Sequence, residues 1–134
     1  MPAYALDSFA VLALFEDEPG GPFVSSLVDK ASRGEAELYL TVVNLGEIVY
    51  RLMYEHGQQQ AGRALAVIRQ WPAEIVPIDL ELGLVAARIK ADRRMGHLDC
   101  FVVALAQERG ATVVTGDPDF RRVEDLVRIE WLER

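Results

Sequence analysis

Short apolar runs that alternate with longer, helix-patterned segments constrain the fold of this chain more than any other feature. Such runs predict strands, and apolar positions spaced three to four residues apart predict helices. The predicted strands are Ala3–Asp7, Glu37–Val42, Glu74–Ile78 and Thr112–Thr115, with Arg128–Leu132 as an edge strand. The predicted helices are Ser8–Phe15, Phe23–Arg33, Asn44–His56, Gln58–Gln70, a helix through Leu84 and Ile89 to Lys90, and Leu98–Glu108. Strands separated by helices imply right-handed crossovers, and therefore an α/β fold with a parallel sheet between helical layers.

Size and composition favour one domain spanning residues 1–134. A chain of 134 residues that is 51% hydrophobic buries about two-thirds of its unfolded surface. Because Cys100 is the only cysteine, no internal disulfide can form, which fits a reducing cytoplasm. Met1–Asp7 lacks the basic region of a signal peptide, and no uncharged run approaches the ~20 residues that span a bilayer. We therefore expect a soluble, cytoplasmic protein with no membrane partner.

The net charge of −7 argues against non-specific binding of nucleic acid, which normally requires a basic surface. A metal-dependent nuclease partly escapes this objection, because bound divalent ions offset the acids of its site. Basic residues are locally clustered and are interpreted as solvated surface at each single position: Arg88, Lys90, Arg93 and Arg94 in one segment, Arg121 and Arg122 in another. The acidic balance also suits a basic protein partner.

Four acidic residues lie at the ends of predicted strands or the starts of predicted helices: Asp7, Glu47, Asp99 and Asp117. Carboxylates are costly to desolvate unless they are paired or bound to a cation. Because sites in parallel sheets form at the carboxyl ends of strands, the four acids are placed to converge. Together they would form an oxygen-only pocket for Mg²⁺ or Mn²⁺ and a centre for phosphodiester chemistry.

Each acid also has a local structural explanation. Asp7 before Ser8 and Asp117 before Pro118 are typical N-caps. Asn44-x-x-Glu47 resembles a capping box with Asn44 as the N-cap. Asp99 lies in the first turn of its helix, where the helix dipole favours a negative charge. Taken singly, each acid is better explained as a cap, but the placement of all four at one predicted sheet edge favours a shared site.

Four short motifs surround these acids. They are Leu6-Asp7-Ser8, Asn44-x-x-Glu47, Leu98-Asp99-x-Phe101-x-x-Ala104 and Thr115-Gly116-Asp117-Pro118-Asp119-Phe120. Their order and spacing resemble the four blocks of the PIN domain, and within that family the VapC-type toxin ribonucleases of toxin–antitoxin pairs. The resemblance spans nearly the whole chain and is weakest across roughly residues 57–73. No motif is decisive alone; the four together make the match.

This resemblance implies a three-layer α/β/α fold with a central parallel sheet of about five strands. It implies an endoribonuclease that uses Mg²⁺ or Mn²⁺, hydrolyses RNA with metal-activated water, forms a homodimer and is covered by a cognate antitoxin. The residues that match the family's acidic quartet, and so its metal ligands, are Asp7, Glu47, Asp99 and Asp117. The residues expected to contact substrate or support the acids are Ser8, Asn44, Thr115 and Asp119, of which Asp119 binds metal through water or starts a turn.

Two other functions are compatible with parts of the sequence. A non-catalytic PIN-like scaffold that binds RNA or protein is favoured where one or more acids are lost, and none is missing here. A receiver-type signalling domain would use Asp79 as phosphoacceptor, but Thr115-Gly116-Asp117 stands where that class has a lysine. Asp79 is better interpreted as the N-cap of the next helix. His56 and His97 lack the partner spacing of a zinc site.

Overall fold

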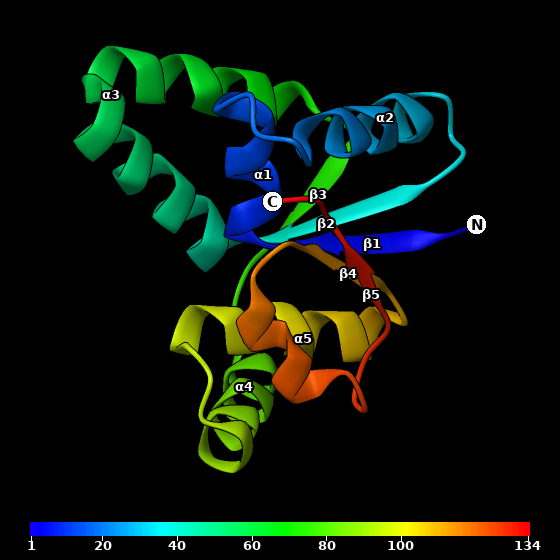
Figure 1. The fold of residues 1–134 in the computed structure, drawn as a ribbon. Helices are drawn as coiled ribbons and strands as arrows, with labels where there is room; N and C mark the ends of the chain where they lie inside the picture. Colours follow the sequence, from blue (N-terminus) through cyan, green and yellow to red (C-terminus); the bar gives the residue numbers. More distant parts are fainter.

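The computed structural model describes residues 1–134 and contains a five-stranded sheet with helices on both faces (Figure 1). The strands are β1 (Ala3–Leu6), β2 (Glu37–Thr41), β3 (Ala73–Val76), β4 (Thr112–Thr115) and β5 (Ile129–Trp131). The helices are α1 (Ser8–Phe15), α2 (Gly21–Ser32), α3 (Val42–Gln70), α4 (Leu80–Arg93), α5 (His97–Arg109) and the 3-10 helix η1 (Pro118–Val123). Every strand pair is parallel, in the order β3-β2-β1-β4-β5. The predicted three-layer α/β architecture is confirmed.

Alternation along the central strands divides the core between the two faces of the sheet. Successive side chains of a strand point to opposite faces. Ala5 and Val113 accordingly pack in a cluster with α4, α5 and η1, whereas Leu6 and Val114, one residue later, pack with α1, α2 and α3. Figure 1 shows these two groups of helices on opposite sides of the sheet. Both faces are covered, as a parallel sheet requires.

The central position of β1 determines where the functional segments meet. β1 pairs with β2 on one side and with β4 on the other, so these three strands end at one edge of the sheet. Asp7 follows β1 directly, α3 begins where β2 ends, and Gly116 and Asp117 follow β4. Asp7 and Asp117 therefore follow neighbouring strands, and Glu47 lies in the second turn of α3, the helix that follows β2. Asp99 comes from α5, in the helical layer that also contains α4.

The largest departure from the sequence prediction concerns α3. It begins at Val42, and its N-cap is Thr41, whose hydroxyl accepts the Asn44 N–H at 3.0 Å. The prediction that Asn44 is the N-cap is therefore wrong: the threonine that ends β2 already has extended backbone dihedrals and a side-chain acceptor. The two predicted helices are two arms of α3, separated by Gly57 with φ at 87°.

Smaller differences have local causes. β3 ends at Val76 rather than Ile78, because Pro77 has no N–H to continue the ladder. α4 ends at Arg93, and Arg94 adopts the left-handed conformation with φ at 58°, two residues before the predicted breaker Gly96. Asp79 caps α4 by accepting the Leu82 N–H at 2.8 Å, as predicted. It follows β3, an edge strand.

No helix of the structure is both long enough and apolar enough to cross a membrane.

Candidate active site

Asp7 is the most deeply buried of the four predicted acids, with 1% of its surface exposed. One carboxylate oxygen accepts the Ala10 N–H at 2.8 Å, which caps α1 as predicted. The other accepts the Thr115 hydroxyl. The pKa of Asp7 is raised to about 8: burial is the main cause, the hydrogen bonds from Thr115 and Ala10 oppose the rise, and the charges of Asp99 and Asp117 add to it. The charged form of this carboxylate is therefore strongly disfavoured without a cation beside it.

Asp99, in the first turn of α5, faces the same acids from the other layer. Burial is the main cause that raises its pKa to about 7, followed by the charges of Asp117, Glu47 and Asp119. Asp99 therefore senses the charges of Glu47 on α3 and of Asp117 and Asp119 at the start of η1. Two titratable carboxyls with such raised pKa values at one sheet edge are typical of functional sites.

The Glu47 carboxylate is held by a hydrogen-bond network of hydroxyl and amide groups. The Ser8 hydroxyl donates to the Glu47 carboxylate, and the Asn44 side-chain amide donates to the Ser8 oxygen at 3.3 Å. The Thr41 hydroxyl in turn donates to the Asn44 carbonyl oxygen. Ser8, Asn44 and Thr41 are buried, so this network fixes the start of α3 against the start of α1. Sequence reasoning missed Thr41; its only signal was a hydroxyl residue three positions before Asn44.

Asp117 and Asp119 form the outer part of the site. The Asp117 N–H donates to the Thr115 hydroxyl oxygen at 3.0 Å, and the Asp117 carboxylate accepts the Asp119 N–H at 2.9 Å. Asp117 thus caps η1, as predicted, and is held close to Asp7 by the shared Thr115 hydroxyl. Asp119 is exposed at the rim.

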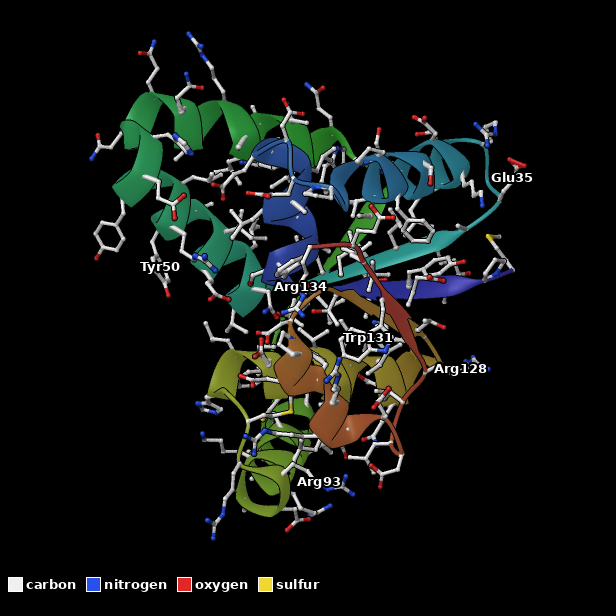
Figure 2. All side chains as sticks on the ribbon, viewed as in Figure 1. Glu35, Tyr50, Arg93, Arg128, Trp131 and Arg134 are labelled. Atoms are coloured by element: carbon white, nitrogen blue, oxygen red, sulfur yellow. The ribbon has the colours of Figure 1, made fainter.

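One guanidinium lies beside these acids. Arg51, one turn after Glu47 on α3, lies 3.9 Å from its carboxylate. None of Asp7, Asp99 and Asp117 has a basic group within 4 Å. Among the predicted basic clusters, Arg93 (labelled in Figure 2) forms a two-pronged ion pair with Asp125, at 2.6 and 2.9 Å, and donates to the Arg122 carbonyl. These contacts join the end of α4 to the end of η1, the 3-10 helix that Asp117 caps.

The sequence matches the PIN domain family over residues 4–126. This chain belongs to the PIN domain family. Proteins of this family are generally nucleases. A comparison with curated protein sequences found no match.

Solved PIN-type structures share the fold at low sequence identity. VapBC2 from Rickettsia felis, bound to a DNA fragment from its promoter, superposes with a TM-score of 0.76 at 17% identity, over 98% of this chain and 99% of that chain. VapC20 from Mycobacterium tuberculosis, a sarcin-ricin loop cleaving toxin, gives 0.70 at 16%, over 89% and 92%. DNA-bound VapBC from Salmonella typhimurium gives 0.69 at 20%, over 97% and 98%. At these identities the likeness shows the fold.

The donor set of this PIN domain fits a hard divalent cation in type and charge. Its donors are carboxylate oxygens, which Mg²⁺ and Mn²⁺ prefer, and the most buried of them has no basic partner. No three of the four carboxylates have oxygen atoms within 4.8 Å of one another. Like charges without a cation between them repel, by ~4 kcal/mol at 4 Å and an effective dielectric near 20, so such spacing is expected of bare acids. In donor type and charge the residues fit the ion.

Proposed function

We propose that this chain is a Mg²⁺- or Mn²⁺-dependent endoribonuclease and the toxin of a toxin–antitoxin pair. One observation carries the proposal. A PIN domain holds a fully buried carboxylate, Asp7, against Asp99 and Asp117 with no cationic side chain to balance them. Charge of this density at the carboxyl edge of a sheet is stabilised by a divalent ion, and PIN domains generally act on nucleic acid.

The roles of the residues follow from their positions. Asp7, Asp99 and Asp117 would hold the ion, and Glu47 would hold a water molecule or a second ion. A divalent ion bound there would acidify coordinated water and offset the charge that develops on the phosphate. Thr115 orients the second oxygen of Asp7, while Ser8 and Asn44 orient Glu47. Asp119 would contribute through water from the rim.

The proposed partners rest on the structural neighbours and on charge. Solved neighbours are VapBC assemblies of toxin and antitoxin, and this chain carries a net charge of −7. A basic antitoxin segment that directs an arginine at the carboxylates would occlude the site through charge-assisted hydrogen bonds. We propose such an antitoxin, a homodimeric toxin, and action on RNA in the cytoplasm.

The test compares purified wild type with Glu47→Gln on total RNA in Mg²⁺ or Mn²⁺, with sequencing of new 5′ ends. Glutamine keeps an oxygen that accepts the Ser8 hydroxyl but removes the charge that a cation requires. Glu108→Gln, an exposed position on α5, is the matched control. We expect cleavage by wild type and by the control, and none by Glu47→Gln.

Two results contradict the proposal. Equal cleavage by wild type and Glu47→Gln would assign the activity to a contaminant or to another site. Absence of cleavage by folded, partner-free wild type would favour the alternative in which this PIN domain is a non-catalytic scaffold for RNA or protein. Sedimentation as a monomer at micromolar concentration would separately remove the homodimer.

A further inference from the structure

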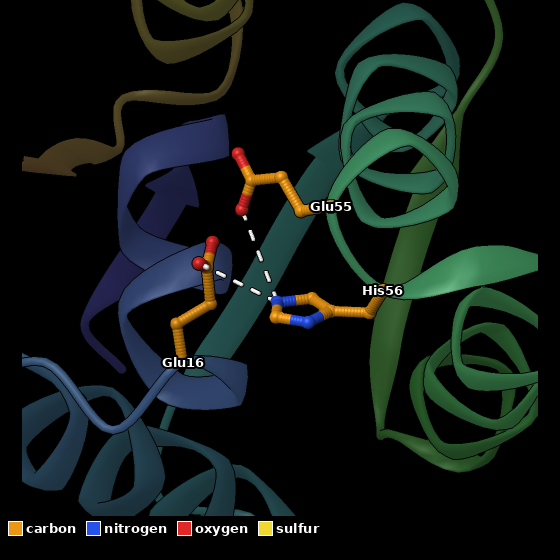
Figure 3. Close-up of side chains that lie close together, drawn as sticks. All are labelled: Glu16, Glu55 and His56. Atoms are coloured by element: carbon orange, nitrogen blue, oxygen red, sulfur yellow. Dashed lines mark ion pairs between the residues drawn. The ribbon is translucent and has the colours of Figure 1, made fainter.

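A second set of potential metal ligands lies outside the acidic quartet, between α1 and α3. Figure 3 shows Glu16, Glu55 and His56 pointing toward one another, with one imidazole nitrogen facing both carboxylates. His56 Nε2 lies 3.8 Å from a Glu16 oxygen and 3.9 Å from a Glu55 oxygen. The three ligand atoms lie within 4.8 Å of one another, and no other set of three acidic, histidine or cysteine side chains in the chain does so. This is a mixed nitrogen and oxygen donor set, unlike the quartet.

The backbone holds these three side chains at fixed helix ends. Glu16 is the C-cap of α1, and its N–H donates to the Leu12 carbonyl at 2.8 Å. Glu55 and His56 are the last residues of the first arm of α3, before the break at Gly57. The C-terminal end of a helix carries partial negative charge and favours cations. Two glutamates at such helix ends add negative charge where the helix dipoles are already negative. A positive charge between the two carboxylates would therefore stabilise the arrangement.

Arginines nearby do not supply that charge. Arg51 and Arg134 line the adjoining cavity together with Glu16 and Glu55. Neither guanidinium lies within 4 Å of these carboxylates, and Arg51 is directed at Glu47. The imidazole of His56 is thus the one basic group within ion-pair distance of both acids.

We propose that Glu16, Glu55 and His56 bind a divalent transition-metal ion, with Zn²⁺ as the best match, at a site separate from the acidic quartet. Ligand atoms about 2.1 Å from a tetrahedral ion lie about 3.4 Å apart. The two separations from His56, 3.8 and 3.9 Å, therefore need to close by about half an ångström, and the two carboxylate oxygens already lie within 4.8 Å of each other. Imidazole nitrogen combined with carboxylate oxygen suits Zn²⁺ better than Mg²⁺. The side chains of His56 and Glu55 are 47% and 44% exposed, which leaves room for water at the fourth position.

The ion would join two elements that carry acids of the proposed nuclease site. α1 begins beside Asp7, and the first arm of α3 contains Glu47 about 12 Å along the helix from Glu55 at 1.5 Å per residue. Because the ligands come from the far ends of both elements, bound metal would hold these elements together without contact with RNA. Its expected effect is therefore stability rather than chemistry.

The experiment measures Zn²⁺ binding by titration calorimetry and by melting temperature, in a background of Asp99→Asn with excess Mg²⁺ so that the quartet does not compete for Zn²⁺. We expect one Zn²⁺ per chain and a rise in melting temperature. In the same background, His56→Gln and Glu16→Gln should each weaken Zn²⁺ binding by at least about tenfold. Glu18→Gln, which lines the same cavity, and His97→Gln, the other histidine, should bind Zn²⁺ unchanged.

The outcomes separate clearly. Loss of Zn²⁺ binding in both cluster variants, with both controls unaffected, establishes the site. Zn²⁺ binding that survives His56→Gln, or no Zn²⁺ binding by the parent protein, overturns it. The far-ultraviolet circular dichroism of the metal-free variants must match that of the parent, which the exposure of His56 favours. RNA cleavage by His56→Gln in the wild-type background should be unchanged, so this test and that of the nuclease proposal fail independently.

Discussion

Thr115 joins Asp7 across two neighbouring strands: its hydroxyl donates to the second carboxylate oxygen of Asp7, the oxygen that the α1 cap leaves free. The same hydroxyl oxygen accepts the Asp117 N–H at 3.0 Å. One buried side chain therefore sets the position of two acids. The bond to Asp7 arises because β1 and β4 are adjacent and parallel, with Leu6 opposite Val114, whereas the bond from Asp117 is local to the end of β4.

Thr115→Val should reduce both the stability and the activity of the protein. Valine has nearly the same shape but leaves a buried Asp7 oxygen and the Asp117 N–H without partners, at a cost of about 1–3 kcal/mol. Urea denaturation measures the loss of stability, and RNA cleavage measures the displacement of the acids. Thr115→Ser keeps the hydroxyl and should retain activity; equal loss in both variants would assign the defect to packing instead.

Asp99→Asn should raise the melting temperature of the metal-free protein and reduce the stabilisation by Mn²⁺. The charges of Asp117 and Glu47 raise the pKa of Asp99, so removal of its charge relieves repulsion. Mn²⁺ at a hundred times its dissociation constant should stabilise wild type by about 2.7 kcal/mol by mass action, and the variant by less. Thermal scans with and without Mn²⁺ measure both effects.

The control for this experiment is Asp92→Asn, which removes an exposed carboxylate from α4. It should leave both the metal-free melting temperature and the Mn²⁺ response close to wild type. A full Mn²⁺ response in Asp99→Asn would show that Asp99 is not a ligand of the shared site.

Local pattern is sufficient to predict the sheet and three of the helix caps. Short apolar runs predict the strands, and the cap roles of Asp7, Asp79 and Asp117 depend only on neighbours in the chain. The sequence predicts that Asp7 and Asp117 converge because both follow strands, and sites in parallel sheets form at the carboxyl ends of strands. The predicted start of α3 was wrong because Thr41, a hydroxyl residue at the end of β2, serves as an N-cap as well as Asn44 would.

Contacts between distant segments could not be predicted in this way. Glu16 and His56 meet because α1 packs against the first arm of α3, and no spacing in the sequence encodes that packing. The absence of partner spacing around His56 therefore said nothing about partners from another helix. The bond from Ser8 to Glu47 could not be predicted for the same reason, because it joins two segments that are 39 residues apart in the chain.

Gly116→Ala should destabilise the protein and displace the start of η1. A methyl group at Gly116 would lie 2.3 Å from the Phe9 Cε1 atom, well inside van der Waals contact. Overpacking of this kind costs typically about 1–3 kcal/mol, and Asp117 follows directly in the chain. Denaturation and RNA cleavage should both show the loss.

Rescue tests the cause of that loss. Phe9→Leu removes the ring atoms that meet the new methyl group, so the double variant should recover part of the stability lost in Gly116→Ala. Additive losses in the double variant would mean that the ring is not the obstacle. The coupling between the two substitutions is the quantity to measure.

The stability of the metal-free protein should fall as pH rises from about 5 to 8. The folded-state pKa of Asp7 is about 8 and that of Asp99 about 7, both above the ordinary value of 3.8, so the folded state retains protons that the unfolded state has released. The stability that these protons confer is complete below about pH 4 and is lost as pH passes through 7 to 8. Urea denaturation in a chelator at pH 5 and pH 8 measures the difference.

Asp7→Asn isolates the contribution of one carboxyl, because asparagine does not titrate. Between pH 5 and pH 8 the variant should lose less stability than wild type, by an amount on the order of a few kcal/mol. Added Mn²⁺ should reverse the trend in wild type, since metal binds the deprotonated carboxylates and gains affinity as pH rises. Identical pH profiles for wild type and Asp7→Asn would show that Asp7 titrates near its ordinary value, and that its burial does not create the demand for a cation.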